Sequence, residues 1–402
     1  CVVLVINMAT AERVGVYPTF ELMTEAQLVR DAPREAADKF SLPQVVQAAL
    51  QKNFDYQAQQ KERDFAQADL NVARSAFLPK LDANGAVSWI DPDVANSFAN
   101  AERTLSWGLQ VEQLLFSPLA LGALRAQRAI IDSAEATVRQ SELDTIQSAA
   151  LAFLNVLRAQ TSEQVNRQNL RSVRRNLELA ELRVQVGSAG RQEVYRWTAE
   201  VANNKASVIQ ANATRNQAEL ELNRAMNRPL EASFTLDVPE EAANVVIDPR
   251  IRPYVDDPWS FRVFRNFLAA EAIERSPEVA QLNAAIEAQE QVLTARRMQL
   301  FLPSAVATAG FTNTLNRSGA GSDDPDPMTG FPPRDNFTWQ LGLGLAFNVF
   351  EWANYAEIDR TDATLMQLTN KRDSVAQRVE QNVRAALHQL GASRAAMKLR
   401  AD

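Results

Sequence analysis

The chain has 402 residues, with 42 Lys and Arg, 49 Asp and Glu, one His and one Cys, and its formal net charge is −7. This acidic balance argues against a protein that binds the phosphate backbone of nucleic acids, which requires clustered Lys and Arg. One cysteine excludes an internal disulfide and a Cys-x-x-Cys metal site. With a single histidine, His388, and no nucleophile motif or phosphate loop, the sequence predicts no enzyme, no metal and no cofactor.

The chain opens on a largely apolar stretch, Cys1 to Ala9. Three interpretations stay open: the core of a signal peptide, a lipidated Cys1, or a buried strand. Residues 3–30, with the pair Thr10-Ala11 after the apolar run, weakly resemble the end of the periplasmic substrate-binding proteins of ABC transporters. That resemblance implies that residues 1–39 are the remnant of a preceding domain or a tail.

Two parts of the chain repeat each other. Leu78-Pro79 recurs as Leu302-Pro303, and the stretch ending at Phe116 recurs in the stretch ending at Phe350. The second copy is longer within 318–335, which we expect to be a surface loop because loops absorb insertions and packed elements do not. Its acidic, proline-broken part, 323–327, favours a solvated extracellular loop over a calcium site. Each copy therefore reads helix, Pro, strand, loop, strand, helix.

Alternation of apolar and polar residues predicts the strands. From Phe337 to Val349 every second residue is apolar, and Leu105 to Leu115 follows the same pattern except at Gln113. Period two gives one apolar and one polar face. Strands of 9–11 residues with an apolar face fit a membrane barrel, and two amphipathic hairpins on a soluble core are the alternative.

Heptad-like spacing predicts two long helices. Leu119 to Val186 contains no Pro and steps its apolar residues by three and four, for example at Leu143, Ile146, Ala150, Phe153 and Leu157. At 1.5 Å per residue such a helix is about 100 Å long. A turn at 187–190 separates it from a second helix over 192–226, so the two must run antiparallel. Four strands cannot close a barrel, which takes at least about eight, so several chains must share one, and three chains supply twelve strands.

Residues 40–402 resemble the TolC family of outer-membrane efflux channels. The match rests on the repeated Phe-Leu-Pro at 77–79 and 301–303, on the paired strands, and on the turn sequence of 186–194. The resemblance implies a mainly α homotrimer with coiled-coil helices and a shared twelve-stranded transmembrane β-barrel. It implies the outer membrane of a Gram-negative bacterium, a long periplasmic extension, and passive conduction for a tripartite efflux or type I secretion system. The implied partners are a periplasmic adaptor and an inner-membrane pump, besides outer-membrane lipid.

The resemblance also assigns candidate site residues. The hairpin tip that meets the adaptor would be Gly187, Ser188, Ala189, Gly190 and Arg191. The lipid face of the barrel would comprise Trp107, Leu109, Val111, Trp339, Leu341, Leu343 and Leu345. The lumen would be lined by Gln110, Glu112, Gln340 and Asn348.

The predicted domains are 40–235 for the first repeat, 236–260 for a linker at mid-height, and 261–402 for the second repeat. The second repeat lacks its own tip and returning helix, so we expect a truncated sequence whose entrance-gating acidic residues would lie beyond Asp402. The competing function is a soluble periplasmic coiled-coil adaptor or structural protein. It accounts for the helices but leaves the apolar strand faces unexplained, and the β-rich domain expected of an adaptor is not visible.

Overall fold

The fold is that of a computed structural model. The structure describes residues 38–95, 100–237, 258–323, 335–348 and 350–401, together with Tyr254 and short pieces between residues 5 and 29. The chain divides into two compact units. Unit 1 comprises Cys1–Gln60 and Arg139–Asp256, and unit 2 comprises Lys61–Val138 and Asp257–Asp402.

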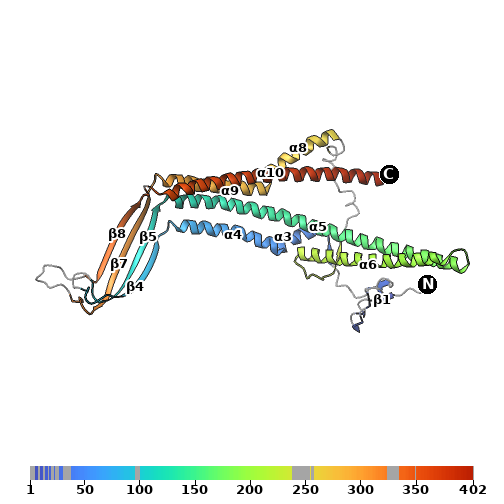
Figure 1. Cartoon of the computed structure of the whole chain (residues 1–402), viewed down its shortest axis with the longest axis horizontal. Coiled ribbons are helices and arrows are strands. Elements are labelled where there is room, and N and C mark those ends of the chain that lie inside the picture. The colour runs from blue at the N-terminus through green and yellow to red at the C-terminus, as the bar shows by residue number, and fades with distance from the viewer. Residues whose placement is uncertain are drawn as a thin grey trace. The chain divides into compact units, whose positions relative to one another are not determined.

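The same order of elements occurs twice along the chain (Figure 1). The first series is α3 (Leu42–Lys52), α4 (Phe54–Ser75), β4 (Lys80–Trp89), β5 (Arg103–Phe116) and α5 (Pro118–Gln185). The second series is α8 (Pro258–Glu274), α9 (Pro277–Gln299), β7 (Ser304–Ser318), β8 (Phe337–Ala346) and α10 (Trp352–Ala401). Helix α6 (Arg191–Ala225) and the short β6 (Phe234–Leu236) lie between them.

A polar residue breaks the first helix of each series. The Asn53 side chain accepts a hydrogen bond from the backbone N–H of Tyr56 at 3.1 Å, where α3 ends and α4 begins. Ser276 caps α9 by accepting from the backbone N–H of Val279 at 3.4 Å, and Pro277 follows it. Short polar side chains favour such helix starts because they satisfy backbone N–H groups that have no partner within the helix.

The four long strands form one antiparallel sheet in unit 2, in the order β4-β5-β7-β8. The two hairpins therefore meet along β5 and β7, while β4 and β8 lie at the edges. Strands β4 and β5 confirm the predicted strands of the first copy. The predicted alternation through Val349 is wrong at its end, because β8 stops at Ala346. Beyond it, the Asn348 side chain donates to Glu351 at 3.1 Å as the chain turns into α10.

Unit 1 has its core where α3, α5 and α6 meet β6. Its members are mostly small or aliphatic: Val45, Ala49, Ala149, Ala152, Phe153, Val156, Ala159, Ala218, Leu222, Met226 and Phe234. Strand β6 pairs in parallel with β3 (Asp38–Phe40). Asn223 is 1% exposed and donates to the carbonyls of Leu230 and Ala232 at 2.8 and 2.9 Å, which fixes the chain after α6.

Helices α5 and α6 confirm the predicted hairpin to within about one residue at each end. The predicted stripe on α5 is partly wrong. Leu143 is exposed, and Ala149, Val156 and Ala159 are buried, one or two residues from the predicted Ala150 and Leu157. The reason is packing: the alanines let α3 and α6 approach α5 closely, so the larger leucines lie at the margin of the seam.

A buried ion cluster joins α5 to α6. Glu163, 6% exposed, accepts from Arg167 at 2.7 Å and from Asn212 at 3.2 Å, and its other oxygen lies 3.1 Å from Nε of Arg215. Burial alone raises the pKa of the Glu163 carboxyl. The hydrogen bonds from Arg167 and Asn212 and the charge of Arg215 outweigh it, so the pKa lies below the ordinary value of 4.5.

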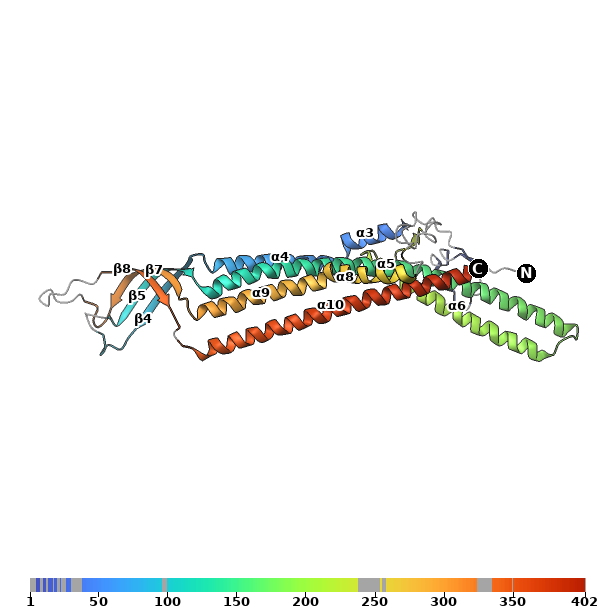
Figure 2. The same ribbon diagram turned by 90° about the horizontal axis from the view of Figure 1, so that it is seen from above.

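In unit 2 the helices α8, α9 and α10 pack together, and α9 and α10 run side by side in both views (Figures 1 and 2). Val279 and Leu282 of α9 meet Val375 of α10, and Arg378 pairs with Glu278 at 2.6 Å. Where α5 crosses α9, Gly122 faces Ala295. A side chain at Gly122 would collide with the Ala295 methyl and lie 3.2 Å from the carbonyl oxygen of Gln291.

Some predicted features fall partly outside the described residues. Of the apolar N-terminal stretch, β1 (Val5–Asn7) is described and pairs in parallel with β2 (Gln27–Val29). The interpretations of Cys1 and the resemblance of residues 3–30 stay predictions. Much of the linker and of the 318–335 loop also lies outside the described residues. The predicted domain boundaries stay predictions as well.

We expect Gly122→Ala and Gly391→Ala to act in opposite directions although both replace a helical glycine. A methyl group at position 122 overpacks the contact between α5 and α9 and should cost about 1–3 kcal/mol. At position 391 the nearest atom is Phe261 Cζ at 4.0 Å, so alanine should stabilise α10 by up to about 1 kcal/mol. Thermal unfolding followed by circular dichroism measures both, and equal shifts would contradict this packing.

Glu163→Gln should weaken the hairpin by about 2–3 kcal/mol, because Arg167 and Arg215 keep their charges and lose their anion. Folding lowers the pKa of Glu163. The carboxylate therefore contributes fully to the free energy of unfolding above pH 4.5, its ordinary pKa, and this contribution is lost as the pH falls through the folded pKa. Amide hydrogen exchange in α5 and α6, corrected for intrinsic rates, should show this acid loss in the native protein and not in the variant. An identical pH dependence in both would contradict the assignment.

Candidate functional site

The strand register sorts side chains of two kinds onto the two sides of the sheet. Residues paired across antiparallel strands point to the same side. One row on the first side is Ala83, Leu109, Phe311 and Trp339. We call this side the apolar face; its apolar residues are Leu81, Ala83, Val87, Trp89, Leu105, Trp107, Leu109, Val111, Ala305, Ala307, Ala309, Phe311, Phe337, Trp339, Leu341, Leu343 and Leu345. The register also places Gly85, Arg103, Gln113, Asn313, Asn316 and Ser318 on this side, most of them toward the end of the sheet away from the helices.

All the residues predicted to face lipid lie on the apolar face. The face is not covered by the described parts of the chain: Leu341, for example, is 74% exposed. Aromatic residues gather at its far end, where the Phe311 ring packs against Trp107 at 5.1 Å and Phe337 at 5.5 Å. At the helix end of β8, Phe350 and Trp352 each lie 6.3 Å from the ring of Tyr355. Aromatic rings at both ends of an apolar band are typical of strands that cross a membrane.

The opposite side is the polar face. Three of the four residues predicted to line a lumen lie on it: Gln110 and Gln340 flank Gly310 in one row, and Glu112 belongs to the next. Asn348 follows the end of β8 and is not part of the sheet. The polar face comprises Lys80, Asp82, Asn84, Ala86, Ser88, Thr104, Ser106, Gly108, Gln110, Glu112, Leu114, Ser304, Val306, Thr308, Gly310, Thr312, Thr314, Arg317, Thr338, Gln340, Gly342, Gly344 and Ala346.

The predicted tip residues form the turn between α5 and α6. Gly187 has φ +72°, and the backbone N–H groups of Gly187 and Ser188 donate to the carbonyls of Val184 and Arg183 at 3.1 and 2.8 Å. This pair of bonds is the Schellman motif, which favours glycine at the residue of positive φ. Gly190 is different: its φ is −86°, and a side chain built there would meet no atom within 4 Å. Within the chain itself, nothing requires glycine at 190.

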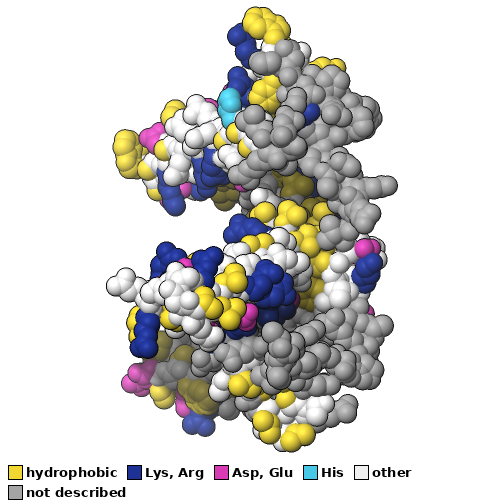
Figure 3. Space-filling view, turned by 90° about the vertical axis from the view of Figure 1, so that its right-hand side faces the viewer, with side chains coloured by type: hydrophobic (Ala, Val, Ile, Leu, Met, Phe, Trp, Pro, Cys, Tyr) yellow, Lys and Arg dark blue, Asp and Glu magenta, His cyan; other side chains and the backbone are white. Residues whose placement is uncertain are grey.

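Large side chains surround this tip without being buried. Val186 is 77% and Tyr195 is 68% exposed, and Leu182 is also exposed. Arg183 lies 3.6 Å from Glu193 across the turn. The space-filling view in Figure 3 shows Lys and Arg side chains beside hydrophobic ones on this face of the molecule. The tip thus offers apolar and basic groups next to an open backbone.

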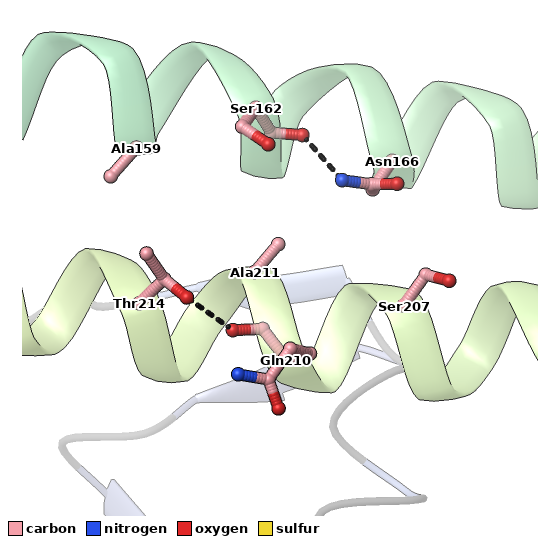
Figure 4. A pocket seen from close by; sticks show the side chains of 7 residues that line it. All are labelled: Ala159, Ser162, Asn166, Ser207, Gln210, Ala211 and Thr214. Carbon is pink, nitrogen blue, oxygen red and sulfur yellow. Dashed lines mark hydrogen bonds between the residues drawn. The ribbon is translucent and has the colours of Figure 1, made fainter.

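A shallow groove lies between α5 and α6 further from the tip (Figure 4). Its volume is about 290 Å³, and it is lined by small or uncharged polar side chains: Ala159, Ser162, Asn166, Ser207, Gln210, Ala211 and Thr214. Several of the polar groups bond to their own helix, as Asn166 does to the Ser162 carbonyl at 2.9 Å. It contains no acid, base or nucleophile pair that would support catalysis.

Two features are absent from the described residues. Among the described residues, no group of three or more His, Cys, Asp or Glu side chains is arranged to hold a metal ion. In the described helices, no stretch is both long and apolar enough to cross a membrane.

Sequence reasoning missed two features. Lys80 belongs to the polar face and was not singled out, and Asp82, which alternates with Leu81 and Ala83, was not named among the lumen residues. The Glu163 cluster had no local signal, because its partners Asn212 and Arg215 come from the other helix of the hairpin.

Comparison with known proteins gives a consistent result. Residues 45–228 match the family of outer membrane efflux proteins, which is not a family of enzymes. The chain is 24% identical over 297 residues to the alkaline protease secretion protein AprF of Pseudomonas aeruginosa. That alignment covers 71% of this chain and 59% of AprF, so the chain spans less than two thirds of this relative.

Solved structures share the fold. CusC superposes with a TM-score of 0.64 at 16% identity, covering 95% of this chain and 80% of CusC. The CmeC outer membrane channel of Campylobacter jejuni gives a TM-score of 0.64 at 17% identity, covering 86% and 70%. An outer-membrane location follows from the family. By sequence over residues 45–228, and by fold over most of its length, the chain is similar to the TolC-like outer membrane efflux proteins.

Proposed function

We propose that this protein is the outer-membrane channel of a tripartite efflux or type I secretion system and conducts its cargo passively. The observation that carries the proposal is the sheet, which has one apolar face, one polar face and two open edges. An apolar face of exposed Trp, Leu and Phe side chains is suited to lipid, and the polar face to a water-filled path. The efflux family and AprF, whose name records protease secretion, support the two kinds of system.

The open edges of β4 and β8 support a shared barrel. Hydrocarbon leaves no water to satisfy the backbone groups of an edge strand, so a sheet in lipid must close. Four strands per chain are too few, and three chains supply twelve. Strands of 10 to 15 residues are long enough to cross the bilayer when tilted. The proposed assembly is therefore a homotrimer with a twelve-stranded barrel.

The hairpin tip, 187–191, is the proposed docking site for a periplasmic adaptor, which in turn reaches an inner-membrane pump. Gly190 is compatible with this: it is the N-cap of α6, a position that suits glycine, and no neighbouring atom fills the space beside it. A missing side chain lets the backbone of another protein approach closely. Exposed Val186 and Tyr195 would add apolar contact beside the turn.

The assembly is tested by light-scattering mass of the full-length protein extracted from membranes in detergent. We expect three copies per particle, found in the outer-membrane fraction and insoluble without detergent. A soluble monomer or dimer that needs no detergent would instead favour the periplasmic coiled-coil adaptor or structural protein. In that soluble form, strand residues on the apolar face should be protected from solvent without detergent, which hydrogen exchange would also reveal.

The docking site is tested by Gly190→Leu, with Asn203→Leu as the matched control. Both positions are exposed, and the control lies about 20 Å further along α6. We expect Gly190→Leu to keep the fold and trimer but to lose export and site-specific crosslinking to an adaptor that is anchored in the inner membrane. Asn203→Leu should keep both. Normal export by Gly190→Leu would refute docking at the tip.

Gly187→Ala should affect stability rather than recognition. Its φ of +72° strains any residue with a side chain, at a cost of about 1 kcal/mol. We expect faster hydrogen exchange in the last turn of α5 and the first turn of α6, whereas Gly190→Ala, at the N-cap of α6, should speed exchange in the first turn of α6 alone. Equal exchange in the two variants would contradict the described turn.

A further inference from the structure

Helix α8 carries large apolar side chains on two sides. Toward α10, Phe261 lies beside Gly391. On another side Trp259, Val263 and Phe267 are 73%, 63% and 60% exposed. Residues four apart in a helix lie on the same face, so these three form one stripe, which we call the α8 stripe. A helix that is apolar on all sides is normally buried, and the described parts of the chain leave this stripe open.

The equivalent helix of the first series does not carry such a stripe. Phe267 precedes Ser276, the polar residue between α8 and α9, by as many residues as Gln44 precedes Asn53 between α3 and α4. Gln44 is polar and exposed. The repeated fold therefore does not require an apolar side chain at this place, and the α8 stripe needs another explanation.

The surface around the α8 stripe is basic, although the chain as a whole is acidic. Helix α8 packs along the C-terminal part of α10 (Figure 1). Neither residues 258–270 nor residues 381–401 contain an Asp or Glu, whereas these two stretches contain Arg262, Arg265, Arg384 and Arg394. The acids of α8, Glu271 and Glu274, come at its end, where Glu271 pairs with Arg275.

Two of these arginines meet rings rather than carboxylates. The guanidinium of Arg262 lies 5.3 Å from the centre of the Trp259 ring. Nη1 of Arg265 lies 2.8 Å from Nε2 of His388, and its Nε is buried with no hydrogen-bond partner. Arg384 differs, because Glu380 pairs with it at 2.7 Å. Exposed Trp and Arg side chains are the kinds that contribute most to binding at protein interfaces, and this surface offers both without matching anions.

We propose that the α8 stripe and Arg262 form a docking site for an acidic amphipathic helix of a partner protein. The apolar residues of that helix pack on Trp259, Val263 and Phe267, and its carboxylates lie near Arg262. Charge complementarity selects this partner, because a basic helix would meet like charge. An acidic segment without an apolar face would leave the stripe in water. The inference goes beyond the channel function, since it concerns a partner of the helices and not the conduit.

The test measures binding of three labelled synthetic peptides of equal length to the full-length protein in nanodiscs of zwitterionic lipid. One peptide is an amphipathic helix with Leu on one face and Glu on the other. The second carries Lys in place of Glu, and the third contains the residues of the first in an order that has no apolar face. Fluorescence anisotropy gives the affinities, and empty discs serve as the blank.

We expect the acidic amphipathic peptide to bind the native protein about tenfold more tightly than either other peptide. Arg262→Glu and Phe267→Gln should each weaken its binding about tenfold. Arg171→Glu, at an exposed arginine of α5, is the matched control and should bind like the native protein. An assembled native protein that does not bind the acidic peptide, or binds it as well after Arg262→Glu, would overturn the inference and leave the channel function intact.

A second measurement separates this partner from other occupants of the α8 stripe. In a Cys1→Ser background, Val263→Cys should react with a soluble maleimide as fast as Asn203→Cys, which is exposed on α6. Labelling that is at least about tenfold slower at 263 would show that the stripe is already covered in the assembled protein, by the acidic linker of 236–260 or by a second copy. That result would also overturn the inference.

Discussion

The rest of the structure depends on a four-stranded sheet whose apolar face and edge strands have no partner among the described parts of the chain. One face presents Trp339, Leu341 and their neighbours to the surroundings, and the edges β4 and β8 present unpaired backbone groups. In water the apolar face would drive association, and in lipid the open edges would be costly. Both demands are met together only if further strands continue the sheet on each side. These two costs are the physical argument for the proposed assembly of several chains.

The helical hairpin is stabilised without a large core. Alanines such as Ala149 and Ala159 bring α5 and α6 close to their neighbours, so contact area is gained by approach rather than by side-chain size. The Glu163 cluster then fixes which parts of the two helices face each other, since a buried carboxylate accepts only the register that brings Arg215 and Asn212 to it. A contact made of alanines alone would allow α5 and α6 to slide past each other. The position of the tip, and of any partner that binds there, therefore depends on a polar contact remote from it.

Periodicity was enough to predict the elements, and insufficient for their contacts. Alternation from Leu105 to Phe116 identified β5, and the Gly-bounded turn at 187–190 separated α5 from α6. The end of β8 was missed because alternation persists in Phe347 and Asn348 after the ladder stops, and ladder hydrogen bonds depend on β7. The α5 stripe was misplaced because alanine has almost no preference for one face, so close approach by α3 decided its burial. Contacts such as Glu163 with Arg215 join residues far apart in sequence, and local patterns contain no record of them.

The two faces of the sheet also differ in volume, which bears on its shape. Opposite the Trp, Phe and Leu side chains of the apolar face, the polar face carries Gly108, Gly310, Gly342 and Gly344 together with Ala, Ser and Thr. A side chain at Gly108 would come within 2.8 Å of the Phe311 carbonyl oxygen, so the small side is required by the backbone as well as tolerated. Sheets bend most easily toward the side that carries the smaller side chains, and glycines aid such bending. The same alternation that separates apolar from polar residues therefore favours curvature with the polar face inside, as the proposed barrel requires.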